Sequence, residues 1–207
     1  MGCGQLPARP PTAMTNDRPY RIINRKTIWE GRFIRSLLLE YKDDRGEMRD
    51  WEAVERVNCN GIVAVIPVTA AGELLMIRQF RPAVNCHVIE FPAGLNDKEE
   101  CLLEAAKREL IEETGYMSDD FELLAEGPVS SGLSSEILTV YLAKNAVYAP
   151  VEVRQKYPAE ETEIIELLNV PLTSAYEIIE EFREHGDMVD IKIYGFIELA
   201  MKRVEEN

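Results

Sequence analysis

Residues 94–116 read GLNDKEECLLEAAKRELIEETGY, and this stretch carries the strongest signal in the chain. Glu109, Glu112 and Glu113 are spaced i, i+3 and i+4, so a helix would place all three carboxylates on one face. Carboxylates gathered in this way repel one another unless they face water or cations neutralise them. Hard cations such as Mg²⁺ take oxygen ligands of this kind. The spacing alone therefore predicts either a solvated acidic face or a metal site.

Arg108 precedes the first of these carboxylates in the sequence, but it points about 100° away around a helix. We therefore expect Arg108 to brace a carboxylate such as Glu100 rather than to take part in metal binding. Gly115 stands where a glycine that ends a helix belongs.

The stretch resembles the Nudix signature, GX5EX7REUXEEXGU, in which U is an apolar residue. The fixed positions and the last apolar one are all matched, by Gly94, Glu100, Arg108, Glu109, Leu110, Glu112, Glu113, Gly115 and Tyr116. The resemblance implies an α/β fold, the Nudix α/β/α sandwich around a mixed sheet, and hydrolysis of a nucleoside diphosphate linked to a second group. It implies Mg²⁺ as cofactor, with Mn²⁺ as a substitute. The implied metal ligands are the Ala93 carbonyl and the carboxylates of Glu109, Glu112 and Glu113, while Glu100 and Arg108 hold the helix and loop in place.

Further blocks resemble the branch of this family that contains ADP-ribose and ADP-sugar pyrophosphatases. Residues 78–95 read RQFRPAVNCHVIEFPAGL, and the segments EGRF and RDWEAVER lie nearer the N-terminus. The resemblance implies that Arg56, Arg81 and Glu90 contact the substrate. The function expected is hydrolysis of ADP-ribose or related ADP-sugars to AMP and a sugar phosphate.

The same branch implies a role for two aromatic residues, Phe33 and Trp51. In its domain-swapped dimers, one aromatic side chain from each subunit stacks on the adenine. Such stacking is worth roughly 1–3 kcal/mol per base. Packing in a hydrophobic core is the alternative for both side chains.

One position departs from the branch. The branch carries SPGLSDE after the signature, whereas residues 130–136 read SSGLSSE, with Ser131 at the proline position. This leaves another nucleotide sugar or a dinucleoside pyrophosphate open as the substrate. Glu136 matches a loop glutamate that serves as general base or metal ligand, so Glu112, Glu113 and Glu136 are rival bases. A third hypothesis is a non-catalytic nucleotide-binding module, although such modules lose signature carboxylates that this chain keeps.

Composition limits the partners that the chain can have. Its 207 residues carry a formal net charge of −14, and no basic stripe of the kind that binds nucleic acid is visible. An acidic chain repels phosphates unless cations intervene, so a phosphate substrate implies bound metal and a few arginines. No apolar run approaches the ~18 residues of a membrane span, and the first residues lack the apolar core of a signal peptide. We expect a cytoplasmic protein without nucleic-acid or membrane partners.

The pattern along the chain divides it into three parts. Residues 1–17 are rich in proline and predict a disordered tail. Residues 18–57 predict a small antiparallel β unit with a hairpin at Gly46. Such a unit does not bury its own apolar face alone, so we expect a homodimer. Residues 58–207 predict the catalytic domain, with strands at 61–68, 74–80, 87–94, 137–143 and 162–170 and helices at 98–114, 172–184 and 191–204.

Overall fold

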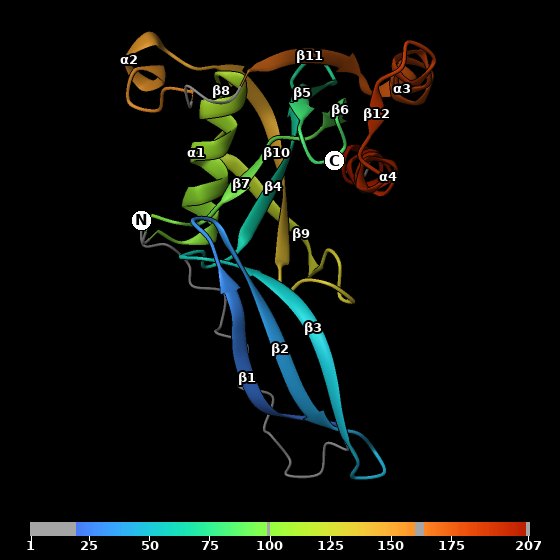
Figure 1. The fold of residues 1–207 in the computed structure, drawn as a ribbon. Helices are drawn as coiled ribbons and strands as arrows, with labels where there is room; N and C mark the ends of the chain where they lie inside the picture. Colours follow the sequence, from blue (N-terminus) through green and yellow to red (C-terminus); the bar gives the residue numbers. More distant parts are fainter. Residues whose placement is uncertain (1–19, 99, 160–163, 206–207) are drawn as a thin grey trace. The chain divides into compact units, whose positions relative to one another are not determined.

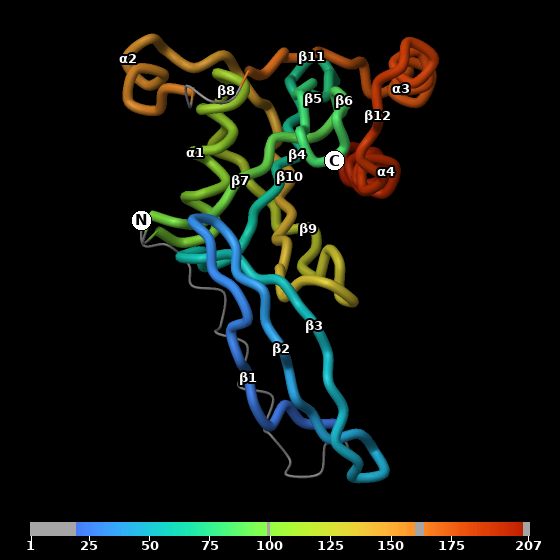
Figure 2. Tube along the Cα trace, in the orientation of Figure 1, coloured from blue at the N-terminus to red at the C-terminus, as the bar shows by residue number. Residues whose placement is uncertain are grey.

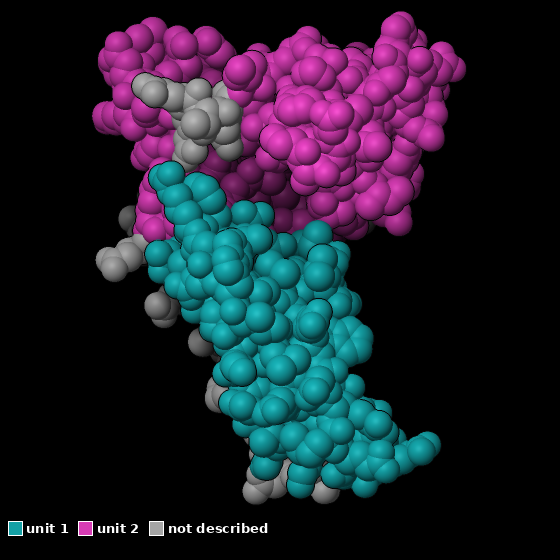
Figure 3. All heavy atoms as spheres, in the orientation of Figure 1, with its two compact units in different colours: residues 1–59, 128–137 teal, residues 60–127, 138–207 magenta. Residues whose placement is uncertain are grey.

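The computed structural model describes residues 20–205 except 99 and 160–163 (Figure 1). The tail expected at residues 1–17 lies outside this range. The described chain forms two compact units (Figure 3). Unit 1 contains the chain up to Cys59 together with residues 128–137, and unit 2 contains residues 60–127 and the chain from Leu138 onward. The inclusion of residues 128–137 in unit 1 has no counterpart in the sequence pattern.

Unit 1 is built on an antiparallel sheet of three strands in the order β1–β2–β3. The strands are β1 (Arg21–Glu30), β2 (Ile34–Lys42) and β3 (Met48–Arg56), and Figure 2 shows them side by side in blue and cyan. Gly46, with a φ of +80°, lies in the turn between β2 and β3, where the hairpin was expected. The small antiparallel sheet predicted from the sequence is therefore confirmed.

Unit 2 contains a mixed sheet in the order β12–β6–β5–β4–β10–β8, in which β4 and β10 are parallel. Strand β11 also pairs with β5, β7 with β4 and β9 with β10. The strands are β4 (Ile62–Thr69), β5 (Glu73–Arg81), β6 (Cys86–Glu90), β7 (Ala93–Leu95), β8 (Tyr116–Met117), β9 (Asp120–Pro128), β10 (Ile137–Tyr148), β11 (Ile165–Pro171) and β12 (Met188–Val189). The helices are α1 (Leu102–Thr114), α2 (Val151–Arg154), α3 (Ala175–Glu184) and α4 (Lys192–Glu205), with a 3-10 turn at Leu172–Ser174.

Strand β4 lies inside the sheet of unit 2, and both of its faces are covered. Val63 and Val65 pack with Leu110 of α1, whereas Ile66 packs in a second cluster with Ile197 of α4. A strand buried on both sides reads as a continuous apolar run, as residues 61–68 do. The expected α/β/α sandwich around a mixed sheet is confirmed.

The ends of α1 differ in how well the sequence predicts them. Gly115 takes a left-handed φ of 74° and donates its N–H to the Ile111 carbonyl, as expected for a helix end. The helix begins at Leu102 rather than at residue 98, and the Cys101 side chain makes no capping hydrogen bond. Strand β9 and the short elements β8, α2 and β12 were not predicted either. No described helix combines the length and the apolar character that crossing a membrane requires.

An ion pair ties β5 to the turn between α3 and β12. Arg78 donates from Nε and Nη2 to the two carboxylate oxygens of Asp187, with both distances 2.9 Å. These bonds lower the pKa of Asp187 below its ordinary value, and the positive charge of Arg78 acts in the same direction. The ionised carboxylate therefore stabilises the fold above that ordinary value, and the contribution disappears as the pH falls through the lowered one.

We expect Asp187→Asn to lower the free energy of unfolding at pH 7 and to weaken the dependence of stability on acid pH. The measurement is urea unfolding of both proteins between pH 7 and pH 3, where the stabilities should converge in acid. Asp119→Asn, at an exposed aspartate of the same unit, is the control. An equal stability gap between wild type and Asp187→Asn at every pH would contradict the prediction.

Candidate active site

Helix α1 holds the signature carboxylates in a largely buried position. Glu109 and Glu113 are 8% and 7% exposed, and the Glu112 side chain is 10% exposed. A buried carboxylate is unfavourable unless hydrogen bonds or positive charge compensate it. The solvated acidic face that the spacing left open is therefore not what this helix presents.

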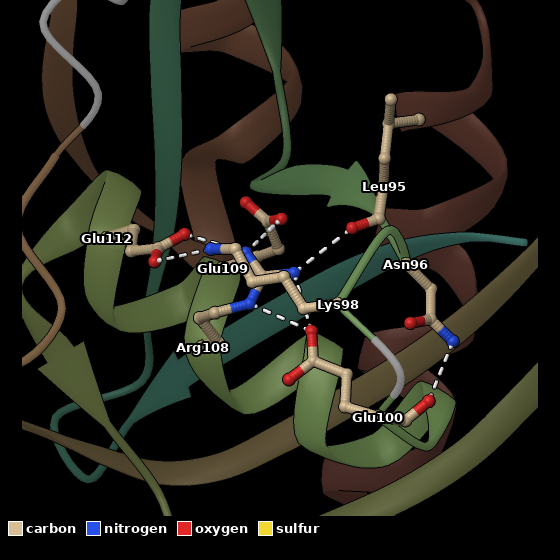
Figure 4. Close-up of polar contacts among 7 residues, drawn as sticks. All are labelled: Leu95, Asn96, Lys98, Glu100, Arg108, Glu109 and Glu112. Carbon is tan, nitrogen blue, oxygen red and sulfur yellow. Dashed lines mark hydrogen bonds and ion pairs between the residues drawn. The ribbon is translucent and has the colours of Figure 1, made fainter. Parts of the chain in front are cut away.

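Arg108 lies among the carboxylates of Glu100, Glu109 and Glu112 (Figure 4). Its Nε and Nη2 donate to Glu100 Oε1 at 2.9 and 2.8 Å. Its Nη1 donates to Glu109 Oε1 at 2.6 Å and to Glu112 Oε2 at 2.7 Å. The expected contact with Glu100 is present, and the other two contacts were missed because the guanidinium reaches back around the helix.

The charge state of Arg108 follows from this environment. Burial by itself would lower its pKa, but the bonds to Glu100 and Glu112 and the charge of Glu109 outweigh burial and raise it. The guanidinium therefore stays cationic, and it also donates to the Leu95 carbonyl at 3.0 Å. One side chain thus joins α1 to the loop that precedes it.

Strand β7, which precedes the loop to α1, approaches the carboxylates through its backbone. The Ala93 N–H donates to Glu113 Oε2 at 2.9 Å. A Cβ at Gly94 would collide with the Glu109 carboxylate, so only glycine allows this carboxylate to lie against the backbone. Asn96 donates from Nδ2 to the Glu100 carbonyl at 3.0 Å. Asn96 occupies a variable position of the signature, where the motif gives no signal for it.

We expect Gly94→Ala to destabilise the protein by about 1–3 kcal/mol, the usual cost of forcing an extra methyl group into a packed site. Urea unfolding provides the measurement. Gly127→Ala is the matched control in the same unit, since a Cβ at Gly127 meets nothing within 4 Å. Equal stability of the two variants would show that the close approach of Glu109 to Gly94 is unimportant.

Comparison with known proteins identifies the fold that carries this site. Residues 60–189 match the family model of the NUDIX domain. The chain belongs to the Nudix family. An ADP-ribose pyrophosphatase of Bacillus subtilis is 30% identical to it over 160 residues, which cover 77% of this chain and 83% of the relative. An ADP-sugar pyrophosphatase of Mus musculus is 30% identical over 195 residues, 88% of each chain.

A solved structure described as an ADP compounds hydrolase supports the same fold. It superposes with a TM-score of 0.73 and 20% sequence identity, covering 91% of this chain and 96% of that one. The Nudix chain is accordingly a pyrophosphohydrolase.

The carboxylates of this Nudix helix are oxygen donors of the kind that a hard divalent cation takes. The positive charge of Arg108 is shared among three carboxylates, and the second cation, Lys98, is half-exposed and 3.4 Å from Glu112. Arg108 and Lys98 thus bring two positive charges to the carboxylates of Glu100, Glu109 and Glu112. Among the described side chains, no three His, Cys, Asp or Glu residues converge as a ready-made metal site.

Two further residues expected to contact substrate lie together in unit 2 of the Nudix chain. Arg81, near the end of β5, donates from Nε to Glu90 Oε2 on β6 at 2.7 Å. In the antiparallel register Glu90 lies opposite Ile77 and Arg81 lies opposite Cys86, so the long Arg81 side chain runs back along β6 to reach Glu90. The Glu90 side chain is largely buried and that of Arg81 is partly exposed, so one edge of the guanidinium faces solvent.

The remaining candidate residues of this Nudix chain belong to unit 1. Phe33 and Trp51 are 60% and 48% exposed, so neither side chain is part of a core within the chain. Arg56 and Glu136 form an ion pair with 2.8 Å between Nε and Oε1. The sequence assigned these two residues separate roles and did not predict their contact, because 80 positions separate them.

Proposed function

We propose that this Nudix hydrolase cleaves the pyrophosphate bond of ADP-ribose or related ADP-sugars to give AMP and a sugar phosphate. The observation that carries the proposal is the buried carboxylate cluster around Arg108, which offers oxygen ligands of the kind that a divalent cation takes, and such a cation in turn offsets the charge of a diphosphate. The choice of an ADP-sugar is supported by the two relatives named as ADP-ribose and ADP-sugar pyrophosphatases.

In this proposal, Mg²⁺ or Mn²⁺ offsets the charge of the phosphates when it is bound. Glu109, Glu112, Glu113 and the Ala93 carbonyl would hold the metal, while Arg108 keeps the helix and its loop aligned. Glu112, Glu113 and Glu136 remain the candidate bases. The residues proposed to bind substrate are Arg81 and Glu90 in unit 2 and Phe33, Trp51 and Arg56 in unit 1.

The test is a panel of ADP-ribose, other ADP-sugars, GDP- and UDP-sugars and dinucleoside pyrophosphates, incubated with the full chain and Mg²⁺ or Mn²⁺. Products are identified by mass. Metal-dependent release of AMP from ADP-ribose or an ADP-sugar is expected. A folded protein that releases no AMP from any ADP-sugar would reject the proposal.

A second candidate keeps the reaction and changes the substrate. Ser131 replaces the proline that the ADP-ribose branch carries, which favours another nucleotide sugar or a dinucleoside pyrophosphate. Values of kcat/KM across the same panel decide between the two. A clear preference for ADP-ribose would dismiss this second candidate.

The oligomeric state and the location are also part of the proposal. Ile22, Ile28 and Trp29 of β1 are at least half exposed in the single chain. Covering such apolar side chains favours association, so we propose a homodimer through unit 1, acting in the cytoplasm. Sedimentation at micromolar concentration is expected to give a dimer, and a monomer would contradict it.

A further inference from the structure

The segment of residues 128–137 is held on the free edge of β3. The Val54 N–H donates to the Leu133 carbonyl at 2.8 Å, and the Ser135 N–H donates to the Val54 carbonyl at 3.2 Å. Val54 and Ser134 form a parallel bridge between these two bonds. The outer edge of a three-stranded sheet would otherwise present unpaired backbone groups, and this segment satisfies part of it.

Two side chains of β3 extend the contact on either side of Val54. Trp51 donates from Nε1 to the Gly132 carbonyl at 3.2 Å. Arg56 donates from Nε to Glu136 Oε1 at 2.8 Å. Strand β3 thus holds Gly132 and Glu136 of the segment through Trp51 and Arg56, two residues to which the proposed function gives substrate contacts.

Glu136 uses both of its carboxylate oxygens in the contact with its neighbours, whereas Arg56 uses only one of its nitrogens among the residues that the structure describes. Glu136 is held through both oxygens, because Ser134 donates from Oγ to Oε2 at 3.3 Å. Arg56 uses only Nε in the contacts of the described chain, and its side chain is 40% exposed. A guanidinium offers five N–H donors in a fixed planar fork, so its Nη groups are available to an anionic oxygen while Nε holds the carboxylate.

We infer that Arg56 is a positioning residue for Glu136, and that it couples the placement of this carboxylate to the binding of a phosphate oxygen. The inference rests on the proposed function, in which the substrate is a nucleoside diphosphate and Glu136 is one of the candidate bases. Nε of Arg56 fixes the carboxylate, and the Nη edge takes the phosphate. A lysine at this position carries the same charge but lacks the fork that makes both contacts at once.

The kinetic test is Arg56→Lys, measured alone and in combination with Glu136→Gln. The single change is expected to lower kcat about tenfold or more, as misplacement of a catalytic group does, while KM changes by less than about threefold. In the Glu136→Gln background, the same change should leave kcat within about twofold. An equal fractional loss of kcat in both backgrounds would show that Arg56 does not act through Glu136.

The matched control for these measurements is Arg49→Lys. Arg49 lies on the same strand and pairs with Asp43 and Glu47 at its other end. It contacts no residue of the proposed site in the described chain, so both kcat and KM should remain at the wild-type values. A loss equal to that of Arg56→Lys would assign the effect to the general stability of β3 and overturn the inference.

A second readout does not depend on turnover. Hydrogen exchange of peptides covering residues 128–137 reports the Ser135 N–H that donates to β3. Exchange in Arg56→Ala should be severalfold faster than in wild type, and exchange in Arg49→Ala should be unchanged. Unchanged exchange in Arg56→Ala would overturn the positioning role. Faster exchange in a chain that hydrolyses no ADP-sugar would instead reject the proposed substrate and support the Arg56–Glu136 contact.

Discussion

Replacing Glu113 by glutamine is expected to lower kcat for ADP-sugar hydrolysis by about a hundredfold or more, the range lost when a general base or a charged ligand is removed. Glutamine keeps the shape and can still accept the Ala93 N–H through its amide oxygen. The amide carries no negative charge with which to bind a metal ion, and it is not basic enough to accept a proton from water. The measurement is steady-state release of AMP at saturating Mg²⁺, with urea unfolding to establish that the variant is folded.

The matched control for this prediction is Glu104→Gln on the same helix. The Glu104 side chain is 53% exposed and pairs with Lys107. We expect its kcat to stay within about twofold of wild type, because a solvated charge in the first turn of α1 interacts weakly with its surroundings. If Glu113→Gln were as active as Glu104→Gln, Glu113 would have no part in metal binding or catalysis.

Removing the guanidinium at the centre of the cluster is expected to have the largest effect on stability. Arg108→Ala should lower the free energy of unfolding by about 3–5 kcal/mol, the loss seen when one partner of a buried ion pair is deleted. The reason is that Glu100, Glu109 and Glu112 would then share a largely buried region without the charge that offsets their repulsion. Denaturant unfolding at pH 7 is the measurement.

Lys107→Ala provides the comparison for Arg108→Ala. Lys107 is the preceding residue of α1, its side chain is 38% exposed, and it pairs with the exposed Glu104. Its loss should change stability by less than about 1 kcal/mol. A loss for Arg108→Ala as small as that for Lys107→Ala would mean that the carboxylates do not need the guanidinium.

The sequence predicted those parts of the fold whose signal is local. The apolar run at residues 61–68 indicated a buried strand, and Gly115 marked the end of α1, because each depends on neighbouring residues. The predicted start of α1 is too early, since Cys101 has an extended backbone and the helix begins at Leu102. Short elements such as β8 and β12 consist of two residues each and leave no periodic pattern.

In the candidate site, too, the sequence predicted local features and missed contacts between distant segments. Helical spacing placed the three carboxylates on one face and directed Arg108 toward Glu100, as the structure has it. Contacts between distant segments, such as Arg56 with Glu136 or Trp51 with Gly132, leave no trace in a single sequence. Arg108 also reaches further than its direction on the helix implies, because its long side chain bends back to the face that carries Glu109 and Glu112.

Strand β3 obtains its last neighbour 70 or more positions later in the chain, when residues 133–135 pair with it. During synthesis, the ribosome therefore releases β1, β2 and β3 long before the segment that closes their open side exists. Until then the three nascent strands expose the unsatisfied edge of β3, in addition to the apolar side chains of β1 that stay exposed in the complete chain, a combination that promotes aggregation. A polypeptide cut short before residue 133 would keep that edge permanently, so premature termination in this region should yield insoluble product rather than a smaller folded unit.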